Sequence, residues 1–133
     1  DTFFLDGRAI TPLPAHHTVP TVGFQLDSGS DSLVFSGDTT THDAFWMAVN
    51  RIANLKYLII ESAFCNQKRD IAIRSRHFCP SLLAEELHKL ERDVEMFITH
   101  MKPGEADVIM DEIQQCIGQY NPRRLENNQS FEF

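Results

Sequence analysis

Apolar residues recur at two different spacings in this sequence, and the change in spacing separates predicted strands from predicted helices. Near the N-terminus, apolar runs bounded by turn residues predict four strands, over residues 2–5, 8–13, 22–27 and 32–36. Asp6-Gly7 separates the first two runs and favours a two-residue hairpin, and the Ser- and Gly-rich segment 28–31 separates the last two. This part of the chain is therefore predicted to form two strand pairs.

After residue 40 the apolar residues recur every three or four positions, the spacing of one face of a helix. Phe45, Val49 and Ile52 indicate a first helix. Pro80 is suited to the first turn of a second helix, and residues 106–120 predict a third. The chain therefore changes from β-structure to alternating helices and strands.

Continuous apolar runs between these helices predict the inner strands. Residues 55–61 include Tyr57-Leu58-Ile59-Ile60, which is too apolar throughout for a strand with one face in water. Residues 94–99 predict the next strand and 130–133 a short last one, whereas the polar, basic segment 66–75 predicts a loop or a short helix. The order β-β-β-β-α-β-α-β-α-β predicts an α/β (α+β) fold with helices packed on a sheet.

The composition is typical of one soluble domain over residues 1–133, because 42% of the residues are apolar and 23% are charged. No apolar run approaches the roughly 20 residues of a membrane-spanning helix, so no membrane partner is expected. The three cysteines form no CxxC spacing and are interpreted as reduced thiols of a cytoplasmic protein. The core is expected to contain large aromatic side chains: Phe3, Phe4, Phe24, Phe64 and Trp46.

The charge balance indicates which classes of partner are expected. Twelve basic and nineteen acidic residues give a net charge of −7. A protein that holds long nucleic acid by its phosphates needs a basic surface, so long nucleic acid is not an expected partner. A small anionic substrate, held locally by a metal, is compatible with this charge.

Three residues with metal-ligating side chains lie beside the ends of predicted strands. His17 precedes the strand at 22–27, Asp38 follows the strand at 32–36, and His100 follows the strand at 94–99. Imidazole nitrogens and a carboxylate suit zinc, manganese or iron. Spacing alone leaves ordinary alternatives open, since surface histidines are common and Asp38 could satisfy the backbone donors of the following helix.

Five short segments combine these residues with further polar ones: HTVPTVGF at 17–24, SGDT at 36–39, IESAF at 60–64, SRHFCP at 75–80 and ITHMKP at 98–103. In order and composition they resemble motifs of the metallo-β-lactamase superfamily, specifically the branch that contains class II cyclic-nucleotide phosphodiesterases and ribonuclease Z. The resemblance covers about residues 8 to 110. It implies the C-terminal half of an αββα sandwich, a mixed sheet with helices on one face.

The first metal motif of that superfamily, HxHxDH, has no counterpart in this chain. The motif belongs to the N-terminal half of the fold. The resemblance therefore implies a missing N-terminal half, cut away, disordered or supplied by another chain.

The resemblance also implies a role for each candidate residue. His17 and His100 would each bind one of two divalent metal ions, with zinc first and manganese or iron as alternatives, and Asp38 would bridge them. The metals would activate water for attack on phosphorus. His77, held by Glu61, would protonate the departing ribose oxygen, a contribution of about 10²–10⁴-fold.

Other interpretations of these residues stay open at this point. His77 could cap the helix that begins near Pro80, and Glu61 at a strand end could be a surface charge. Cys79 could chelate a metal, although a small buried residue is the simpler interpretation. The remaining histidines are interpreted as structural or solvent-facing: His16, His42 and His88.

The sequence therefore predicts a metal-dependent hydrolase of phosphodiester bonds, resembling a 3′,5′-cyclic-nucleotide phosphodiesterase that acts on a small substrate. Arg76 precedes His77 where a Gly is more usual, and the charge of −7 with no basic arm also favours this group. One alternative is a ribonuclease Z-like endonuclease that processes transfer RNA 3′ ends. Another is a non-catalytic half-domain that binds a partner, as a homodimer or with the missing half.

The isolated chain is expected to have little or no activity. Two histidines and one carboxylate give each metal about two ligands, fewer than the three that a catalytic zinc usually has.

Overall fold

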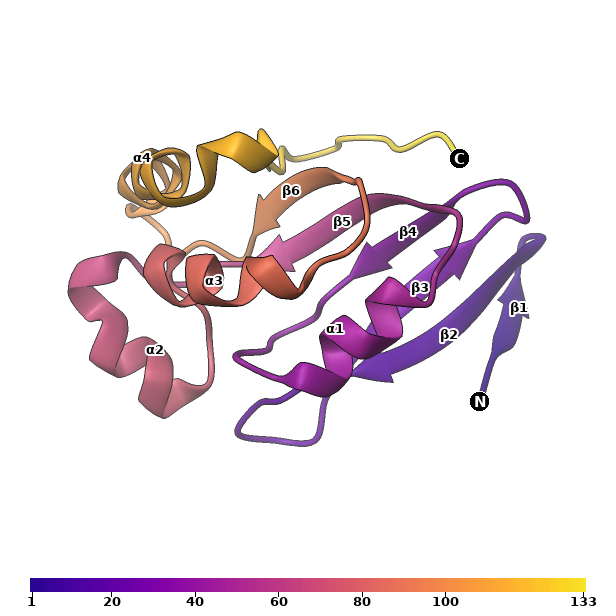
Figure 1. The fold of residues 1–133 in the computed structure, drawn as a ribbon, viewed down its shortest axis with the longest axis horizontal. Coiled ribbons are helices and arrows are strands. Elements are labelled where there is room, and N and C mark those ends of the chain that lie inside the picture. The colour runs from indigo at the N-terminus through magenta and orange to yellow at the C-terminus, as the bar shows by residue number, and fades with distance from the viewer.

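Seven strands form one mixed sheet in which the strand order follows the chain order (Figure 1). The computed structural model describes all residues from 1 to 133. The strands are β1 (Phe3–Leu5), β2 (Arg8–Pro14), β3 (Val22–Asp27), β4 (Ser32–Phe35), β5 (Leu55–Glu61), β6 (Glu95–Thr99) and β7 (Arg123–Arg124). Strands β1 to β4 pair antiparallel, whereas β4 to β7 pair parallel. Consequently β2, β4, β5, β6 and β7 all run in one direction.

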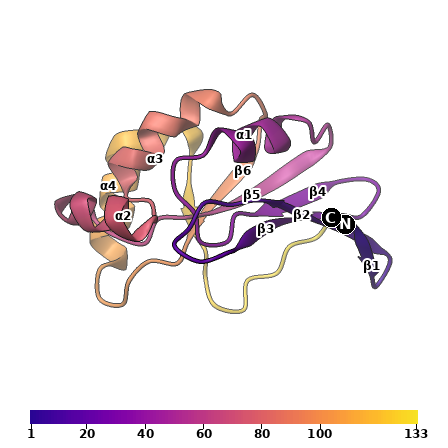
Figure 2. The same cartoon turned by 90° about the horizontal axis from the view of Figure 1, so that it is seen from below.

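The helices lie on one face of this sheet, as Figure 2 shows with the sheet seen nearly edge-on. They are α1 (Asp43–Asn50), α2 (Arg69–Ser75), α3 (Pro80–Glu86) and α4 (Ala106–Ile117), with short 3₁₀ turns at Asn66–Lys68, Leu87–Lys89 and Gly118–Tyr120. Pro80 begins α3, where a missing N–H costs no hydrogen bond. None of the helices combines the length and the apolar content needed to cross a membrane. The predicted α/β fold, a mixed sheet with helices on one face, is confirmed.

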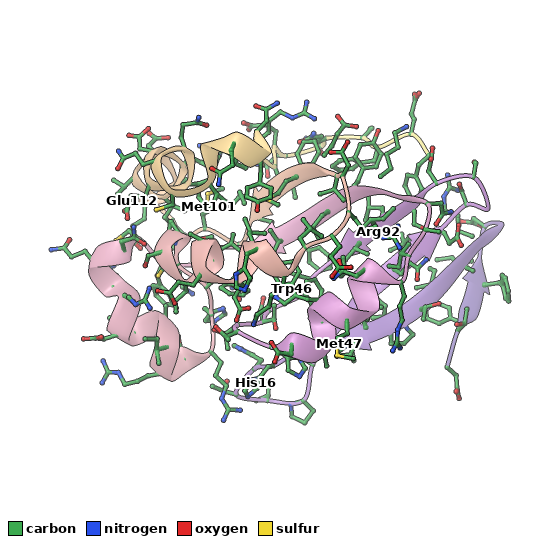
Figure 3. The ribbon with its side chains drawn as sticks, in the orientation of Figure 1. His16, Trp46, Met47, Arg92, Met101 and Glu112 are labelled. Carbon is green, nitrogen blue, oxygen red and sulfur yellow. The ribbon has the colours of Figure 1, made fainter.

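The main core lies between the sheet and α1, α3 and α4, where 21 buried residues form one cluster. Alternation along β5 sends Leu58 and Ile60 into this cluster. On α1, Trp46 is 2% exposed while the next residue, Met47, is 57% exposed (Figure 3). Phe45, Val49 and Ile52, whose spacing predicted this helix, are buried, and the predicted burial of Trp46 is confirmed.

The opposite face of the sheet is covered only in part, by the segment after β7 (Figure 2). Leu33, Ile59 and Phe97 are buried there. The Phe131 ring packs edge-on against Tyr57, with centroids 5.0 Å apart, and Arg8 donates a hydrogen bond of 3.1 Å to the Phe133 carbonyl. The C-terminal segment thus acts as a strap across this face.

Two sequence predictions about the chain ends are wrong. Residues 130–133 form no strand, because Phe131 and Phe133 cover the sheet with their side chains, and the last strand is Arg123–Arg124. Phe3 and Phe4, predicted to be in the core, are 49% and 78% exposed, because β1 is an edge strand beyond the helices. The segment 66–75, predicted as a loop or short helix, contains a 3₁₀ turn followed by α2.

Candidate metal centre

The fold brings all five predicted site residues to one edge of the sheet. Because β2, β4, β5 and β6 run in the same direction, their C-terminal ends meet at that edge. Asp38 follows β4, Glu61 is the last residue of β5, and His100 directly follows β6. His17 lies in the loop after β2, and His77 lies between α2 and α3.

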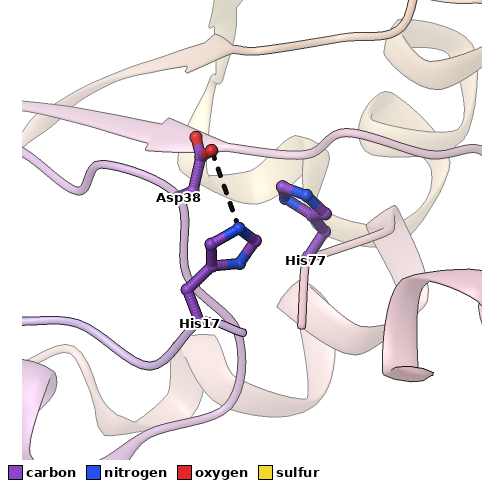
Figure 4. Close-up of side chains that lie close together, drawn as sticks. All are labelled: His17, Asp38 and His77. Carbon is purple, nitrogen blue, oxygen red and sulfur yellow. Dashed lines mark ion pairs between the residues drawn. The ribbon is translucent and has the colours of Figure 1, made fainter. Parts of the chain in front are cut away.

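Asp38 lies between two imidazoles. One carboxylate oxygen is 3.9 Å from Nε2 of His17, and the other is 3.6 Å from Nε2 of His100. His17, Asp38 and His77 each offer a ligating atom within 4.8 Å of the others (Figure 4). The His77 ring stacks on that of His100, with centroids 5.2 Å apart and planes 28° apart.

The orientation of two rings fits a metal site. The Nδ1–H of His17 donates to the Arg76 carbonyl at 3.0 Å, and the Nδ1–H of His77 donates to Glu61 at 2.6 Å. Each bond fixes one ring nitrogen and leaves Nε2 available toward Asp38 and its surroundings. Ligating histidines in metalloproteins are usually held in this way, by a carbonyl or carboxylate on the other nitrogen. The donor set therefore fits a divalent metal.

Glu61 holds the loops of the centre together through hydrogen bonds. Its side chain is fully buried, which excludes the interpretation as a surface charge. One oxygen accepts from the Thr39 N–H at 2.9 Å as well as from His77. The other accepts from the N–H groups of Ala63 and Phe78, at 3.2 and 3.0 Å. A single carboxylate thus joins the loop that carries Asp38 to the loop that carries His77.

Two glycines allow the loops of His17 and Asp38 to come together. A Cβ on Gly23 would lie 2.7 Å from the Phe35 carbonyl oxygen. A Cβ on Gly37 would lie 2.7 Å from the Val22 carbonyl oxygen, and Gly37 has a φ of +63°. Both contacts are shorter than a side chain can accept, so the glycines of the HTVPTVGF and SGDT segments serve the same close approach.

Two threonines add hydrogen bonds that the sequence reasoning missed. Thr39 accepts from the His16 N–H through Oγ1 at 2.9 Å. Thr40 donates from its N–H to the His16 carbonyl at 3.2 Å, and its hydroxyl donates to the His77 carbonyl at 3.1 Å. The place of Thr39 in SGDT was the only signal in the sequence for these contacts.

The other histidines and cysteines take no part in the centre. His42 was predicted to face solvent but is half-buried at the start of α1, and burial together with the nearby His16 lowers its pKa. Cys79 is fully buried, with Sγ 3.4 Å from the Ser81 hydroxyl. The helix-capping alternatives also fail, because neither α1 nor α3 has a side-chain cap.

Comparison of the sequence with family models and with curated proteins gives no match. Comparison of the structure with solved structures gives strong matches. A Bacillus subtilis metallo-β-lactamase fold protein, YhfI, superposes on 98% of this chain with a TM-score of 0.74 at 18% identity. The chain has the metallo-β-lactamase fold.

Two further structures share this fold. Yeast PDE1 matches 95% of the chain with a TM-score of 0.75 at 17% identity, and human tRNase Z, short form, matches 76% with a TM-score of 0.60 at 17% identity. The chain covers 51% of YhfI, 46% of PDE1 and 38% of tRNase Z. It therefore spans about half the length, or less, of these metallo-β-lactamase fold structures.

Proposed function

We propose that this chain forms the metal-binding half of a hydrolase that cleaves phosphodiester bonds in small substrates of the cyclic-nucleotide type. The observation that carries the proposal is the arrangement around Asp38. One of its oxygens lies 3.9 Å from Nε2 of His17 and the other lies 3.6 Å from Nε2 of His100. His77, held by the buried Glu61, lies against both histidines.

We assign the metal ligands from this geometry. His17 and His100 would each hold one divalent ion, and the Asp38 carboxylate would contact both. Imidazole with carboxylate favours zinc, with manganese or iron as alternatives. The bound ions would supply a Lewis acid for the phosphoryl oxygens and lower the pKa of water to about 7.

Each ion would still need further ligands, because a catalytic zinc commonly has three from the protein. We propose that these come from a part of the protein outside this chain, since the structures it matches are about twice as long. The isolated chain is accordingly proposed to bind metal weakly and to have little activity.

His77 is assigned as the general acid. Its Nδ1–H is held by Glu61 at 2.6 Å, and the other ring nitrogen, Nε2, is left free to carry the proton that is transferred. From there it donates its proton to the departing alkoxide oxygen. The stacked ring of His100 limits rotation of His77. Positioned acids of this kind contribute about 10²–10⁴-fold.

The proposed substrate is small because the net charge of −7 is unfavourable for long nucleic acid. The greater fold likeness to yeast PDE1 than to human tRNase Z supports the same choice. A transfer-RNA 3′-processing nuclease is the second candidate, favoured by the likeness to tRNase Z itself. We assign the protein to the cytoplasm because its three cysteines are free.

The face of the sheet opposite the helices has a part that the C-terminal segment leaves uncovered. This part is the proposed contact with the rest of the longer protein. The lining there is entirely apolar: Phe3, Leu5, Ile10, Phe24, Leu26, Leu33, Phe35 and Ile59. A patch of this kind on a sheet face is typical of a surface that packs against another layer. We propose a second β-layer of the longer protein as its occupant, and a second copy of this chain is the outcome expected for a non-catalytic module.

The direct test uses the full-length protein with added zinc or manganese. Hydrolysis of cyclic AMP, cyclic GMP and bis(p-nitrophenyl) phosphate is expected, with loss of activity in Asp38→Asn. Cleavage of precursor transfer RNA, with cyclic nucleotides untouched, would favour the second candidate. An absence of hydrolysis on all of these substrates would contradict the proposed function.

A further inference from the structure

Arg76 occupies a backbone conformation that favours glycine. It ends α2 with a φ of 56° and a ψ of 54°, in the left-handed region. Helices often end in this conformation, and the residue there is usually Gly because a Cβ is strained. The chain nevertheless places a long cationic side chain at this position, directly before His77. A non-glycine residue that keeps this strained conformation beside a site indicates that its side chain has a role there.

The side chain and the carbonyl of Arg76 both bond to His17. Its backbone carbonyl accepts the Nδ1–H of His17 at 3.0 Å, and its Nη1 donates to the His17 carbonyl at 2.9 Å. The two residues are thus joined by a reciprocal pair of hydrogen bonds across 59 positions of sequence. One bond holds the imidazole of His17 and the other holds its backbone.

The guanidinium of Arg76 has no competing partner. Two other cations of the same segment are paired with acids, since Arg69 bonds to Glu85 and Lys68 bonds to Glu105. Arg76 forms no ion pair, and its side-chain hydrogen bond goes to His17 alone. In the loop that carries His17, the next residues, from Thr18 to Pro20, are exposed.

We propose that Arg76 is a positioning residue for His17, and this inference rests on the proposed metal centre. The carbonyl of Arg76 selects the Nδ1–H tautomer, and the guanidinium fixes the backbone that carries the ring. Together they hold Nε2 of His17 toward Asp38, 3.9 Å away. Because Arg76 is bonded to His77 through the chain, the same residue sets the spacing between the ligand and the general acid.

The test compares Arg76→Gly, Arg76→Lys and Arg74→Ala in the full-length protein. Glycine removes the guanidinium and also the backbone strain, so the melting temperature is expected to stay within about 4 °C of wild type. Zinc affinity is expected to fall about 10-fold or more, the usual effect of losing a residue that orients a ligand. Arg76→Lys should restore part of the zinc affinity. Arg74 forms a hydrogen bond only within α2, so Arg74→Ala should leave zinc affinity unchanged.

A second readout needs no metal. Long-range ¹H–¹⁵N spectra of the metal-free protein should show a single Nδ1–H tautomer for His17 in wild type. Arg76→Gly keeps the carbonyl that accepts this proton but loses the guanidinium that fixes the His17 backbone, so the Nδ1–H bond should loosen and a mixture of tautomers should appear. Unchanged tautomer and zinc affinity in Arg76→Gly would overturn the role of Arg76 and leave the proposed function standing. A lower melting temperature of Arg76→Gly with an unchanged His17 tautomer would also overturn the role of Arg76. Wild-type protein that binds no zinc would contradict the metal centre, while the tautomer still decides the role of Arg76.

Discussion

The proposed centre has a proton-transfer side and a metal side, and the two are built differently. On the proton-transfer side, Glu61 is fully buried and accepts four hydrogen bonds, and the His77 side chain is 9% exposed. On the metal side, the Asp38 and His100 side chains are 41% and 40% exposed, and only that of His17 is less exposed, at 12%. The oxygens of Asp38 reach imidazole nitrogens only at 3.6 and 3.9 Å, beyond hydrogen-bond distance.

In the proposed mechanism, this difference divides the work between the protein and the metal. The proton-transfer side is already organised by hydrogen bonds, which fix His77 without any ligand. On the metal side, the Asp38 oxygens lie 3.6 and 3.9 Å from the imidazole nitrogens, and a bound cation would draw these groups together. Substitutions on the first side should therefore reduce folding stability, and those on the second should reduce metal binding. The expected losses of stability below run from the largest to the smallest.

Glu61→Gln should cause the largest loss. The carboxylate accepts from three backbone N–H groups and His77, and an amide group in its place would turn a donor toward some of those N–H groups. The free energy of unfolding should fall by about 3 kcal/mol. Urea denaturation checks this, with Glu85→Gln as control, because its exposed pair with Arg69 contributes less than about 1 kcal/mol. Equal midpoints in the two variants would contradict the central position of Glu61.

Gly37→Ala should cost about 2 kcal/mol. The new Cβ would meet the Val22 carbonyl at 2.7 Å, in addition to the strain of a φ of +63°. Gly7→Ala is a matched control, since Gly7 has a φ of +76° and nothing within 4 Å of its Cβ position. The difference between their unfolding free energies isolates the close approach of the two loops. A smaller loss in Gly37→Ala than in Gly7→Ala would show that the loops can separate freely.

His77→Ala should lower stability by only about 1 kcal/mol, because Glu61 keeps its three backbone donors. Its effect on catalysis should be larger, a fall in kcat of about 10²–10⁴-fold on cyclic nucleotides. With bis(p-nitrophenyl) phosphate the fall should be much smaller, because that leaving group needs no proton. A loss of zinc affinity in this variant would instead identify His77 as a ligand, as its proximity to His17 and Asp38 allows.

Asp38→Asn should have the smallest effect on stability. The carboxylate is partly exposed and forms no short hydrogen bond, so the metal-free protein should change by less than about 0.5 kcal/mol. Zinc at 100 times its dissociation constant should stabilise wild type by about 2.7 kcal/mol and the variant by much less. Thermal unfolding with and without zinc measures both values. A variant that zinc stabilises as strongly as wild type would place the metal elsewhere.

The sequence predicted most of the fold because the residues that determine it are close to one another in the chain. The apolar spacing placed the helix around Phe45 and Val49, and Asp6-Gly7 marked the first hairpin. The predictions that were wrong concern long-range packing. Phe131 covers Tyr57 from 74 positions away, which no local periodicity encodes, so its segment was predicted as a strand.

The candidate site could also be predicted only in part. The five motif segments predicted His17, Asp38, Glu61, His77 and His100 as site residues, and the structure brings them together; their functional roles stay predictions. The supporting contacts were not predictable, because they join loops through backbone atoms. Thr39 to Glu61, and Arg76 to His17, depend on how the loops approach rather than on residue type.

The zinc stoichiometry of the full-length protein tests the central claim most directly. Elemental analysis after dialysis should find about two zinc ions per chain in wild type. Asp38→Asn, which removes a ligand from both proposed ions, should retain fewer than one. Equal zinc content in wild type and Asp38→Asn, or no zinc in wild type, would contradict the metal centre.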